Sequence, residues 1–412
     1  MIDGFYSPNM KLGHFRCGPL AGHIDGFAAL LSCQGYATPT ARWKIRLVAD
    51  LSTWLGRRYL GIKNLEEAEV NEFLKARKRQ LLLRRGDGRT LTQLLHHLRQ
   101  VGTIPSPRLP VIDTPMDRIT HDYAHFLAHQ RGLSQVTIDN YVPIAQRFLE
   151  TRFGAGKVCL DELCVADVTD FIVHDSSTAC PRRAQLTGSA LRSFLGFLTQ
   201  EGKITANLAA SVPTVANWRL SELPQFLEPA QVENLLRSCD QNSQSGRRDY
   251  AVLLLLARLG LRAGEVVNLN LEDINWAAGE VLIRGKSARE DRLPLLSAVG
   301  RALAAYLKRD RPACSCRRVF IRMKAPRQGF SSSVAVCDIL RRALTRAHLH
   351  PQQKGAHLLR RSLATKMLRR GASLAQIGEV LRHQLAQTTE IYAKVDLVAL
   401  RALAQPWPGG AR

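Results

Sequence analysis

Residues 357–392 read HLLRRSLATKMLRRGASLAQIGEVLRHQLAQTTEIY, and this stretch decides the interpretation of the 412-residue chain. It places His357 three positions before Arg360, and His383 nine positions before Tyr392. Residues three apart on a helix share a face, so we expect the first histidine and the arginine to project together. The stretch therefore combines a cation, two imidazoles and a phenol in a fixed order.

Two cations upstream complete a candidate site. Arg262 lies in the run LGLRAGE, where Glu265 is placed to orient it. Lys286 lies where a predicted strand enters a hairpin turn, and Arg284 and Arg289 flank it as rival cations. An arginine binds phosphate oxygens through a charged planar fork, whereas a lysine can also give up its proton.

These six residue types suit the breaking and rejoining of a phosphodiester through a covalent bond to protein. The reaction needs positioned positive charge around the phosphate oxygens. A histidine can exchange a proton with an attacking phenol. A phenol has a pKa of about 10, so it needs nearby cations or a base to attack at neutral pH. Any one of these residues alone could equally be a solvated or a packing side chain. The occurrence of all six in this order indicates the chemistry.

The charge of the chain indicates a polyanionic partner. Lys and Arg number 58 against 35 Asp and Glu, a net charge of +23, and such an excess is typical of nucleic-acid binding. A ribosome-surface or membrane-surface protein is the alternative on charge alone. The excess is concentrated in residues 341–382, which include the candidate site, and in residues 75–89.

The cysteines and the apolar runs indicate a cytoplasmic protein without a membrane partner. The nine cysteines are scattered, without the spacing of a zinc site, and are expected to be reduced thiols. No signal peptide opens the chain. The longest apolar run, residues 251–257, is far short of a membrane span.

Proline-rich breaks at residues 105–115 and 213–224 predict linkers. Three blocks result: residues 1–110, 116–212 and 224–412.

The first two blocks resemble each other. Matching apolar and glycine positions recur at offsets of 97, 98 and 100, at helical spacings. The last set pairs Leu91, Leu94, Leu95, Leu98, Gln100, Gly102 and Ile104 with Leu191, Phe194, Leu195, Leu198, Gln200, Gly202 and Ile204. We expect two helical bundles of one kind, with Ser134 as a helix N-cap in the second. The basic residues 75–89 of the first bundle would then add DNA contacts outside the core site. A helical dimerisation or packing domain is the alternative for this bundle.

The third block mixes helices with a small sheet. Helices are predicted over 230–238 and 249–258, and from about residues 299, 334 and 358; strands are predicted over 280–284 and 292–295. The expected fold class for the chain is mainly α with a small β-sheet (α+β).

The six residues and the sequence around them resemble the tyrosine site-specific recombinases, or phage integrase family. The resemblance covers about residues 116–400 and is most specific in the last forty, through GASL, LRH, TT and IY. Two departures stand out. Arg361 replaces a second histidine that the family often has after the motif arginine. Arg382 replaces the family's usual glycine, and its side chain would add a phosphate contact or crowd the turn.

The resemblance implies a role for each site residue. The catalytic set would be Arg262, Lys286, His357, Arg360, His383 and Tyr392. Both arginines would bind the phosphate, Lys286 would protonate the departing 5′ oxygen, and Tyr392 would form a 3′-phosphotyrosine. Because the bond energy is kept, rejoining would need no metal, ATP or other cofactor. Residues 116–212 would be the core-binding bundle and residues 224–412 the catalytic domain.

The resemblance also implies the partners. The protein would clamp double-stranded DNA, with a dimer on two inverted half-sites and a tetramer in synapsis, and would recombine through a Holliday junction. Accessory recombinases or DNA-bending proteins are possible partners. A tail helix over residues 396–404 would dock on the neighbouring protomer or on its own domain. The extra first block indicates an integrase or transposon recombinase of a mobile element.

Two other functions stay open at this point. A type IB topoisomerase would share the chemistry but act as a monomer without site preference. A catalytically silent regulator would keep the fold and bind DNA without a covalent adduct, although the complete set of six residues argues against it.

Overall fold

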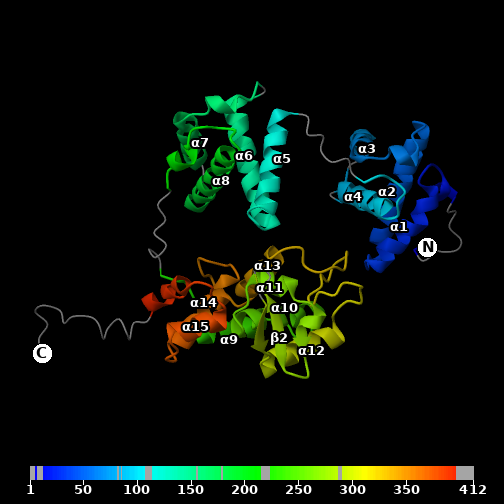
Figure 1. The fold of residues 1–412 in the computed structure, drawn as a ribbon. Helices are drawn as coiled ribbons and strands as arrows, with labels where there is room; N and C mark the ends of the chain where they lie inside the picture. The colour runs from blue at the N-terminus through cyan, green and yellow to red at the C-terminus, as the bar shows by residue number, and fades with distance from the viewer. Residues whose placement is uncertain are drawn as a thin grey trace, which may run out of the picture. The chain divides into compact units, whose positions relative to one another are not determined.

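A computed structural model shows the fold of the chain (Figure 1). It describes residues 5–6, 13–80, 83–84, 86–106, 114–154, 156–177, 180–214, 223–285 and 290–395. Contacts divide the chain into two compact units, residues 107–221 and a unit of residues 1–106 with 222–412. Each of the three predicted blocks has a hydrophobic core cluster of its own. The division into three domains stays a prediction.

The first block contains a bundle of helices. They are α1 (Ile24–Cys33), α2 (Thr38–Arg57), α3 (Glu67–Gln80) and α4 (Asp87–Gln100). Helix α4 buries Leu91, Leu94, Leu95 and Leu98, a spacing of three and four that defines one apolar face. Full burial of each such leucine contributes roughly 1.5–3 kcal/mol, so this stripe holds the helix against its neighbours.

The second block is also a helical bundle. Its helices are α5 (Pro115–His129), α6 (Gln135–Phe153), α7 (Val165–Ser177) and α8 (Pro181–Gln200). Ser134 is the N-cap residue of α6, as predicted, although its hydroxyl contacts the Thr137 hydroxyl at 3.1 Å and not a backbone N–H. The repeat positions Leu191, Phe194, Leu195 and Leu198 are buried in the second half of α8, which starts ten residues before Leu191.

The two bundles have the same helix order and nearly the same spacing. Helix α2 begins at residue 38 and α6 at residue 135, while α4 ends at residue 100 and α8 at residue 200. Short 3-10 helices, Ile62–Asn64 and Leu160–Glu162, also occupy equivalent places. Gly102 and Gly202 both have positive φ, 73° and 65°. These agreements support the repeat; a common origin of the two blocks stays our proposal.

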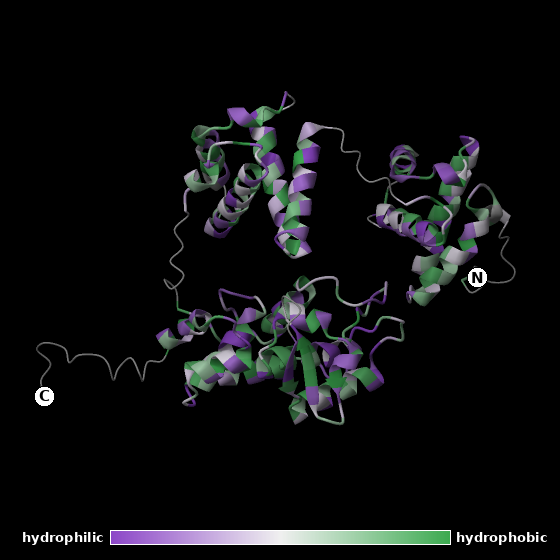
Figure 2. Ribbon diagram, in the orientation of Figure 1, coloured by the Kyte–Doolittle hydropathy of each residue, from purple (hydrophilic) through white to green (hydrophobic). Residues whose placement is uncertain are grey.

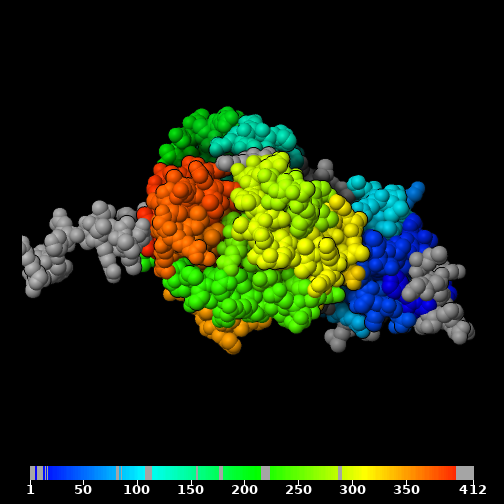
Figure 3. Space-filling view, turned by 90° about the horizontal axis from the view of Figure 1, so that it is seen from below, coloured from blue at the N-terminus to red at the C-terminus, as the bar shows by residue number. Residues whose placement is uncertain are grey.

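The third block carries most of the remaining helices. They are α9 (Pro229–Arg237), α10 (Gln244–Arg258), α11 (Ala263–Asn268), α12 (Ser297–Arg309), α13 (Val334–Arg346), α14 (His357–Leu368) and α15 (Leu374–Leu381). The chain then forms the 3-10 helices Ala386–Thr388 (η9) and Glu390–Val395 (η10). In Figure 3 the orange and red surface, which includes α14, α15 and the 3-10 helices, adjoins the green and yellow surface of the same block.

A three-stranded antiparallel sheet lies in this block. Its strands β1 (Ile274–Asn275), β2 (Glu280–Arg284) and β3 (Glu290–Pro294) are ordered β1-β2-β3. The two predicted strands are present, whereas β1 is too short to show the alternation that marks a strand in sequence. The mainly α class with a small sheet is confirmed.

Helix α10 lies at the centre of the third block. Residues 251–257 are buried without interruption, because α9, α11, α12, α13 and α14 all contact this helix. Figure 2 shows the same helix and β2 in the green of hydrophobic residues. The long apolar run is therefore a core helix. Among the described residues, no helix combines the length and apolar character that crossing a membrane requires.

Candidate active site

Arg360 joins three segments of the third block. It lies in the first turn of α14 and is 3% exposed. Its guanidinium donates hydrogen bonds to the carbonyl oxygens of Gly260, after α10, and Leu381, at the end of α15. The approach depends on Gly260, whose φ is 60° and where a Cβ would lie only 2.7 Å from Leu381 Cδ2. A side chain at position 260 would force these segments apart.

His357 is the first residue of α14, one turn before Arg360. The two residues therefore share a helix at the predicted spacing. Their environments differ, because the histidine is exposed and the arginine is buried. The structure thus places His357 at the rim of the arginine site.

Arg262 and Glu265 form a local pair at the start of α11. Arg262 is the N-cap residue of this helix. The Glu265 carboxylate accepts hydrogen bonds from the Arg262 backbone N–H at 2.7 Å and from its Nη1 at 2.9 Å. The Glu265 side chain is 5% exposed and the Arg262 side chain 37%. The carboxylate therefore holds the arginine while part of the guanidinium stays accessible.

Arg382 uses the same carboxylate. Its Nη2 donates to the second oxygen of Glu265 at 2.8 Å, and its side chain is 4% exposed. Its backbone is left-handed, with a φ of 55°, a region that disfavours residues other than glycine. The arginine in place of the usual glycine at position 382 is visible in the sequence. Its partner, Glu265, could not be predicted, because it lies 117 residues earlier. The Arg382 guanidinium pairs with Glu265, and its expected effect, a phosphate contact or crowding of the turn, stays a prediction.

Glu265→Gln is expected to destabilise the third block by about 3–5 kcal/mol, because it leaves the buried Arg382 charge without a carboxylate. The control is Glu233→Gln, whose partner Arg258 forms a far more exposed pair and which should change stability by about 0–1 kcal/mol. Calorimetric unfolding of both variants measures the difference. Equal stability of the two variants would contradict the structural role of Glu265.

His383 and Tyr392 lie face to face. Their rings are parallel within 7°, with centroids 6.4 Å apart. His383 Nδ1 lies 2.7 Å from the Thr389 hydroxyl. Tyr392, in η10, is 2% exposed and packs in a small apolar cluster with Ala364, Ile377 and Leu381. The predicted nucleophile is thus held by packing rather than presented to solvent.

Burial, modified by the charges of the site, shifts three pKa values. Burial, followed by the neighbouring Arg262 and Arg382, lowers the pKa of Arg360 to about 10. Burial and the charges of Arg360, Arg262 and Arg382 lower the pKa of His383 to about 4, so its ring is neutral at physiological pH. Burial raises the pKa of the Tyr392 phenol, and Arg360 partly opposes that rise. A phosphate bound to the arginines would offset their charge and so change their effect on the pKa values of His383 and Tyr392.

The pKa shift of His383 predicts a pH-dependent stability. Its pKa is about 4 in the folded protein and about 6.5 in an unfolded chain. The unfolded state therefore binds more protons between these values, and stability should be lost as the pH falls from about 6.5 towards 4. The stability advantage of wild type over His383→Asn should shrink in this window, in thermal unfolding at a series of pH values. His350→Asn, at an exposed position, is the control; an advantage independent of pH would contradict the shift.

Lys286 lies outside the described residues, as does its rival Arg289. The other rival, Arg284, ends β2 and pairs with both Asp273 and Glu290. Its guanidinium is therefore held by two carboxylates on the sheet side of the turn. The assignment of Lys286 stays a prediction.

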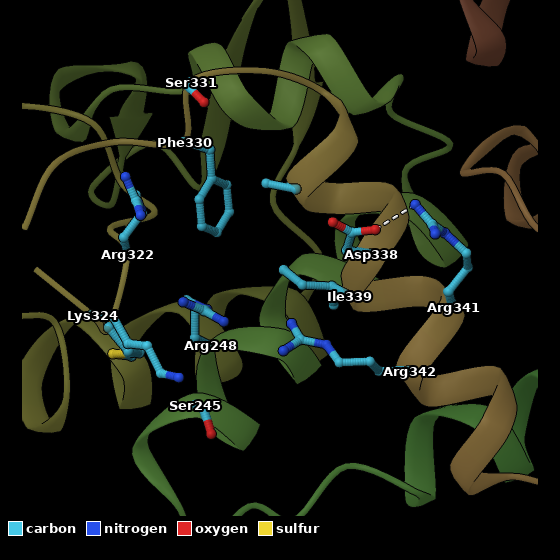
Figure 4. Close-up of a pocket in the computed structure, with 12 residues that line it drawn as sticks. Ser245, Arg248, Arg322, Lys324, Phe330, Ser331, Asp338, Ile339, Arg341 and Arg342 are labelled. Atoms are coloured by element: carbon cyan, nitrogen blue, oxygen red, sulfur yellow. Dashed lines mark ion pairs between the residues drawn. The ribbon is translucent and has the colours of Figure 1, made fainter. Parts of the chain in front are cut away.

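A cavity of about 750 Å³ lies elsewhere in the third block, between α10, α13 and the segment before α13 (Figure 4). None of the predicted catalytic residues lines it. The labelled Arg248, Arg322, Lys324 and Arg342 surround it. Arg248 and Arg342 both pair with Asp249, so the other two are the cations of this cavity without an ion pair among the described residues.

The structure thus connects four of the six predicted residues. Arg360 contacts the backbone of Leu381, Arg262 contacts the backbone of Arg382, and His383, which follows these two residues, stacks on Tyr392. His357 lies at the rim. Within the described ranges, no group of three or more His, Cys, Asp or Glu side chains could hold a metal ion. The arrangement offers two arginines to an anion beside a neutral imidazole and a phenol.

Comparisons with known proteins bear on this arrangement. A model of the phage integrase family matches residues 225–397. The chain is 44% identical over 410 residues to the "Putative integrase/recombinase y4rA" of Sinorhizobium fredii (strain NBRC 101917 / NGR234), with 99% of each chain covered. It is 26% identical over 299 residues to the tyrosine recombinase XerC of Bacillus pumilus (strain SAFR-032), which covers 70% of this chain and 95% of that protein.

A solved structure has the same fold over much of the chain. It is the XerH site-specific recombinase bound to palindromic difH substrate, in a post-cleavage complex. The TM-score is 0.55 at 19% identity, with 69% of this chain and 83% of that chain covered.

Proposed function

Because the chain belongs to the phage integrase family and is a tyrosine recombinase, we propose that it cuts and rejoins double-stranded DNA at a specific site through Tyr392. The observation that supports this most is the neighbourhood of Tyr392. Its ring stacks on His383, and the charge of Arg360 acts on its phenol. The proximity of the Tyr392 phenol to a buried arginine and a neutral imidazole supports its proposed role as the nucleophile.

The roles follow from the chemistry of each group. Arg262 and Arg360 bind the non-bridging oxygens of the scissile phosphate and stabilise the charge of the transition state. His383 hydrogen-bonds to the same phosphate. His357, at the exposed rim, exchanges a proton with the attacking phenol, and Lys286 protonates the departing 5′ oxygen.

Strand transfer is a balanced exchange of esters. The Tyr392 oxygen forms a bond to phosphorus as the bond to the 5′ oxygen breaks, which leaves a 3′-phosphotyrosine and a 5′ hydroxyl. Attack by a 5′ hydroxyl then reverses the step on the same or another strand. No metal, ATP or other cofactor takes part in this scheme. Exchange of both strand pairs proceeds through a Holliday junction.

The proposed assembly is a dimer on two inverted half-sites and a tetramer that joins two duplexes. The palindromic substrate of the XerH complex supports this arrangement by analogy. Integration, excision or transposition of a mobile element in the cytoplasm is the setting that we propose, since a relative that matches 99% of the chain is named a putative integrase/recombinase. Accessory recombinases or DNA-bending proteins would set the direction.

A suicide half-site tests the proposal. Wild-type protein is incubated with nicked duplexes from the DNA that flanks its gene, and the products are separated on a denaturing gel. We expect a covalent protein–DNA band that forms without added metal or ATP. Tight site binding without a band would favour the silent regulator. Relaxation of supercoiled DNA by a monomer, without preference for any site, would favour the topoisomerase.

A further inference from the structure

The two helical bundles differ strongly in charge. Residues 1–108 contain 17 Lys and Arg against 8 Asp and Glu, whereas residues 116–212 contain 9 against 10. The block that resembles a core-binding bundle is thus close to neutral. Of the two bundles, the first is therefore the one that attracts a polyanion at long range, although the folds of the two bundles correspond helix by helix.

Much of the positive charge of the first block lies around the end of α3 and the start of α4. The exposed cations there are Lys75, Lys78, Arg79, Arg84 and Arg89. Within the described part of the chain, none of them forms an ion pair with a carboxylate. Arg77, by contrast, is neutralised by Asp50 at 2.7 Å. The unpaired cations are therefore available to an external anion.

Lys44 lies beside this cluster as a buried cation. It is 5% exposed, and its ammonium donates to the Thr90 hydroxyl at 3.0 Å and to the Gln93 side-chain oxygen at 2.9 Å. Both acceptors are neutral. The Lys44 ammonium also lies 4.5 Å from the centroid of the Tyr36 ring. This cation–π contact is weaker than an ion pair. No carboxylate among the described residues pairs with Lys44.

A buried ammonium without a counter-charge is unfavourable, because desolvation disfavours the charged form. Burial and the nearby Arg89 accordingly lower the pKa of Lys44 to about 8. The Thr90 hydroxyl keeps its orientation by donating to the Gly86 carbonyl at 2.9 Å. The Thr90 and Gln93 oxygens thus hold the ammonium in place without balancing its charge, and an arriving anion would supply the missing counter-charge.

An aromatic ring borders the same site. Trp43 is half-buried, and the Arg84 guanidinium lies 5.7 Å from its ring centroid. A Cβ on Gly86 would lie 2.9 Å from the Trp43 ring, so the turn before α4 packs closely against the indole. This packing fixes Arg84 and the start of α4 next to Lys44.

We propose that Lys44, Arg84 and Arg89, with Trp43 between them, form a second DNA-binding surface that holds the phosphate backbone of duplex DNA. We call it the Lys44 surface. The inference rests on the proposed function only in taking DNA as the polyanion. Several cations along two helices fit a polymer of evenly spaced phosphates better than a single small anion. The contacts are to phosphate, so this surface adds affinity without reading sequence.

The Lys44 surface is particular to the first bundle. At the offset of 97, the place of Lys44 is taken by Tyr141 in the second bundle. At the offset of 100, the place of Arg89 is taken by Ser189. We therefore assign most of the salt-dependent affinity outside the third block to the first bundle.

The test compares two double variants of the full chain that lose the same charge. Arg84→Gln with Arg89→Gln removes two cations of the Lys44 surface. Arg57→Gln with Lys63→Gln removes two exposed cations, one at the last residue of α2 and one in the 3-10 helix Ile62–Asn64, and it serves as the control. Affinity for a random-sequence duplex is measured by fluorescence anisotropy over a range of salt concentrations.

The first double variant should bind about tenfold to a hundredfold more weakly at low salt, and the slope of log K against log salt should become shallower by about 2. The control should keep the wild-type slope. Equal slopes for the two variants, or a wild-type slope in the first variant, would overturn the inference. Wild type that binds no DNA would instead contradict the proposed function.

Lys44→Met gives an independent measurement at the centre of the site. The substitution keeps a long unbranched side chain and removes the ammonium. The unfolding temperature shows whether the variant is folded. A folded variant should bind the duplex more weakly than wild type. At saturating protein it should still form the covalent half-site product. Undiminished binding by a folded variant would overturn the role of Lys44. If the variant does not fold, the double variant of Arg84 and Arg89 tests the surface.

Discussion

Tyr392→Phe is expected to abolish the covalent protein–DNA product while duplex binding persists. The substitution removes the only atom that can form the phosphodiester to protein, so no slower route through this residue remains. The ring keeps its stacking on His383 and its packing with Ile377 and Leu381. Stability should therefore change by no more than about 1.5 kcal/mol, the usual scale of one hydrogen bond.

The experiment pairs this variant with Tyr250→Phe, which makes the same chemical change on α10. Both proteins are incubated with the suicide half-site, and binding is followed separately on a native gel. Only the Tyr250 variant should give the covalent band, at the wild-type level. A covalent band from Tyr392→Phe would place the nucleophile at another residue.

Arg360→Gln is expected to lower the rate of strand cleavage by about 10²- to 10³-fold or more, the usual effect of removing one positioned donor from a charged transition state. It should also destabilise the third block. The buried carbonyl oxygens of Gly260 and Leu381 lose their donor, and each unpaired buried group costs about 1–3 kcal/mol. Cleavage is measured by quench-flow or manual sampling under single-turnover conditions, at a temperature where the variant is folded.

The control is Arg369→Gln at the other end of α14, where the arginine pairs with Glu228 at the surface. It should cleave within about twofold of wild type, as expected for an exposed pair. Arg360→Lys separates charge from geometry, since lysine keeps the charge but not the planar fork, and it should fall between the two. Wild-type cleavage by folded Arg360→Gln would remove this residue from the catalytic set.

Much of the fold could be predicted because the sequence carries local, periodic signals. The leucines of α4 and α8 recur at spacings of three and four, and β2 alternates buried residues with residues that are partly or fully exposed. The family was also recognisable from the order of residue types between Arg262 and Tyr392. Strand β1 had no comparable signal, since two residues show no period.

The contacts of the site could not be predicted in the same way, because they join residues far apart in the chain. Sequence alone determined which groups are present: two arginines, two histidines, a tyrosine, and the excess of cations in the first block. Only the tertiary structure decided that Glu265 serves both Arg262 and Arg382, and that Arg360 ties α10 to α15. It likewise decided that Lys44 is buried without a carboxylate. Burial and long-range pairing depend on which helices pack together, and local periodicity does not encode that choice.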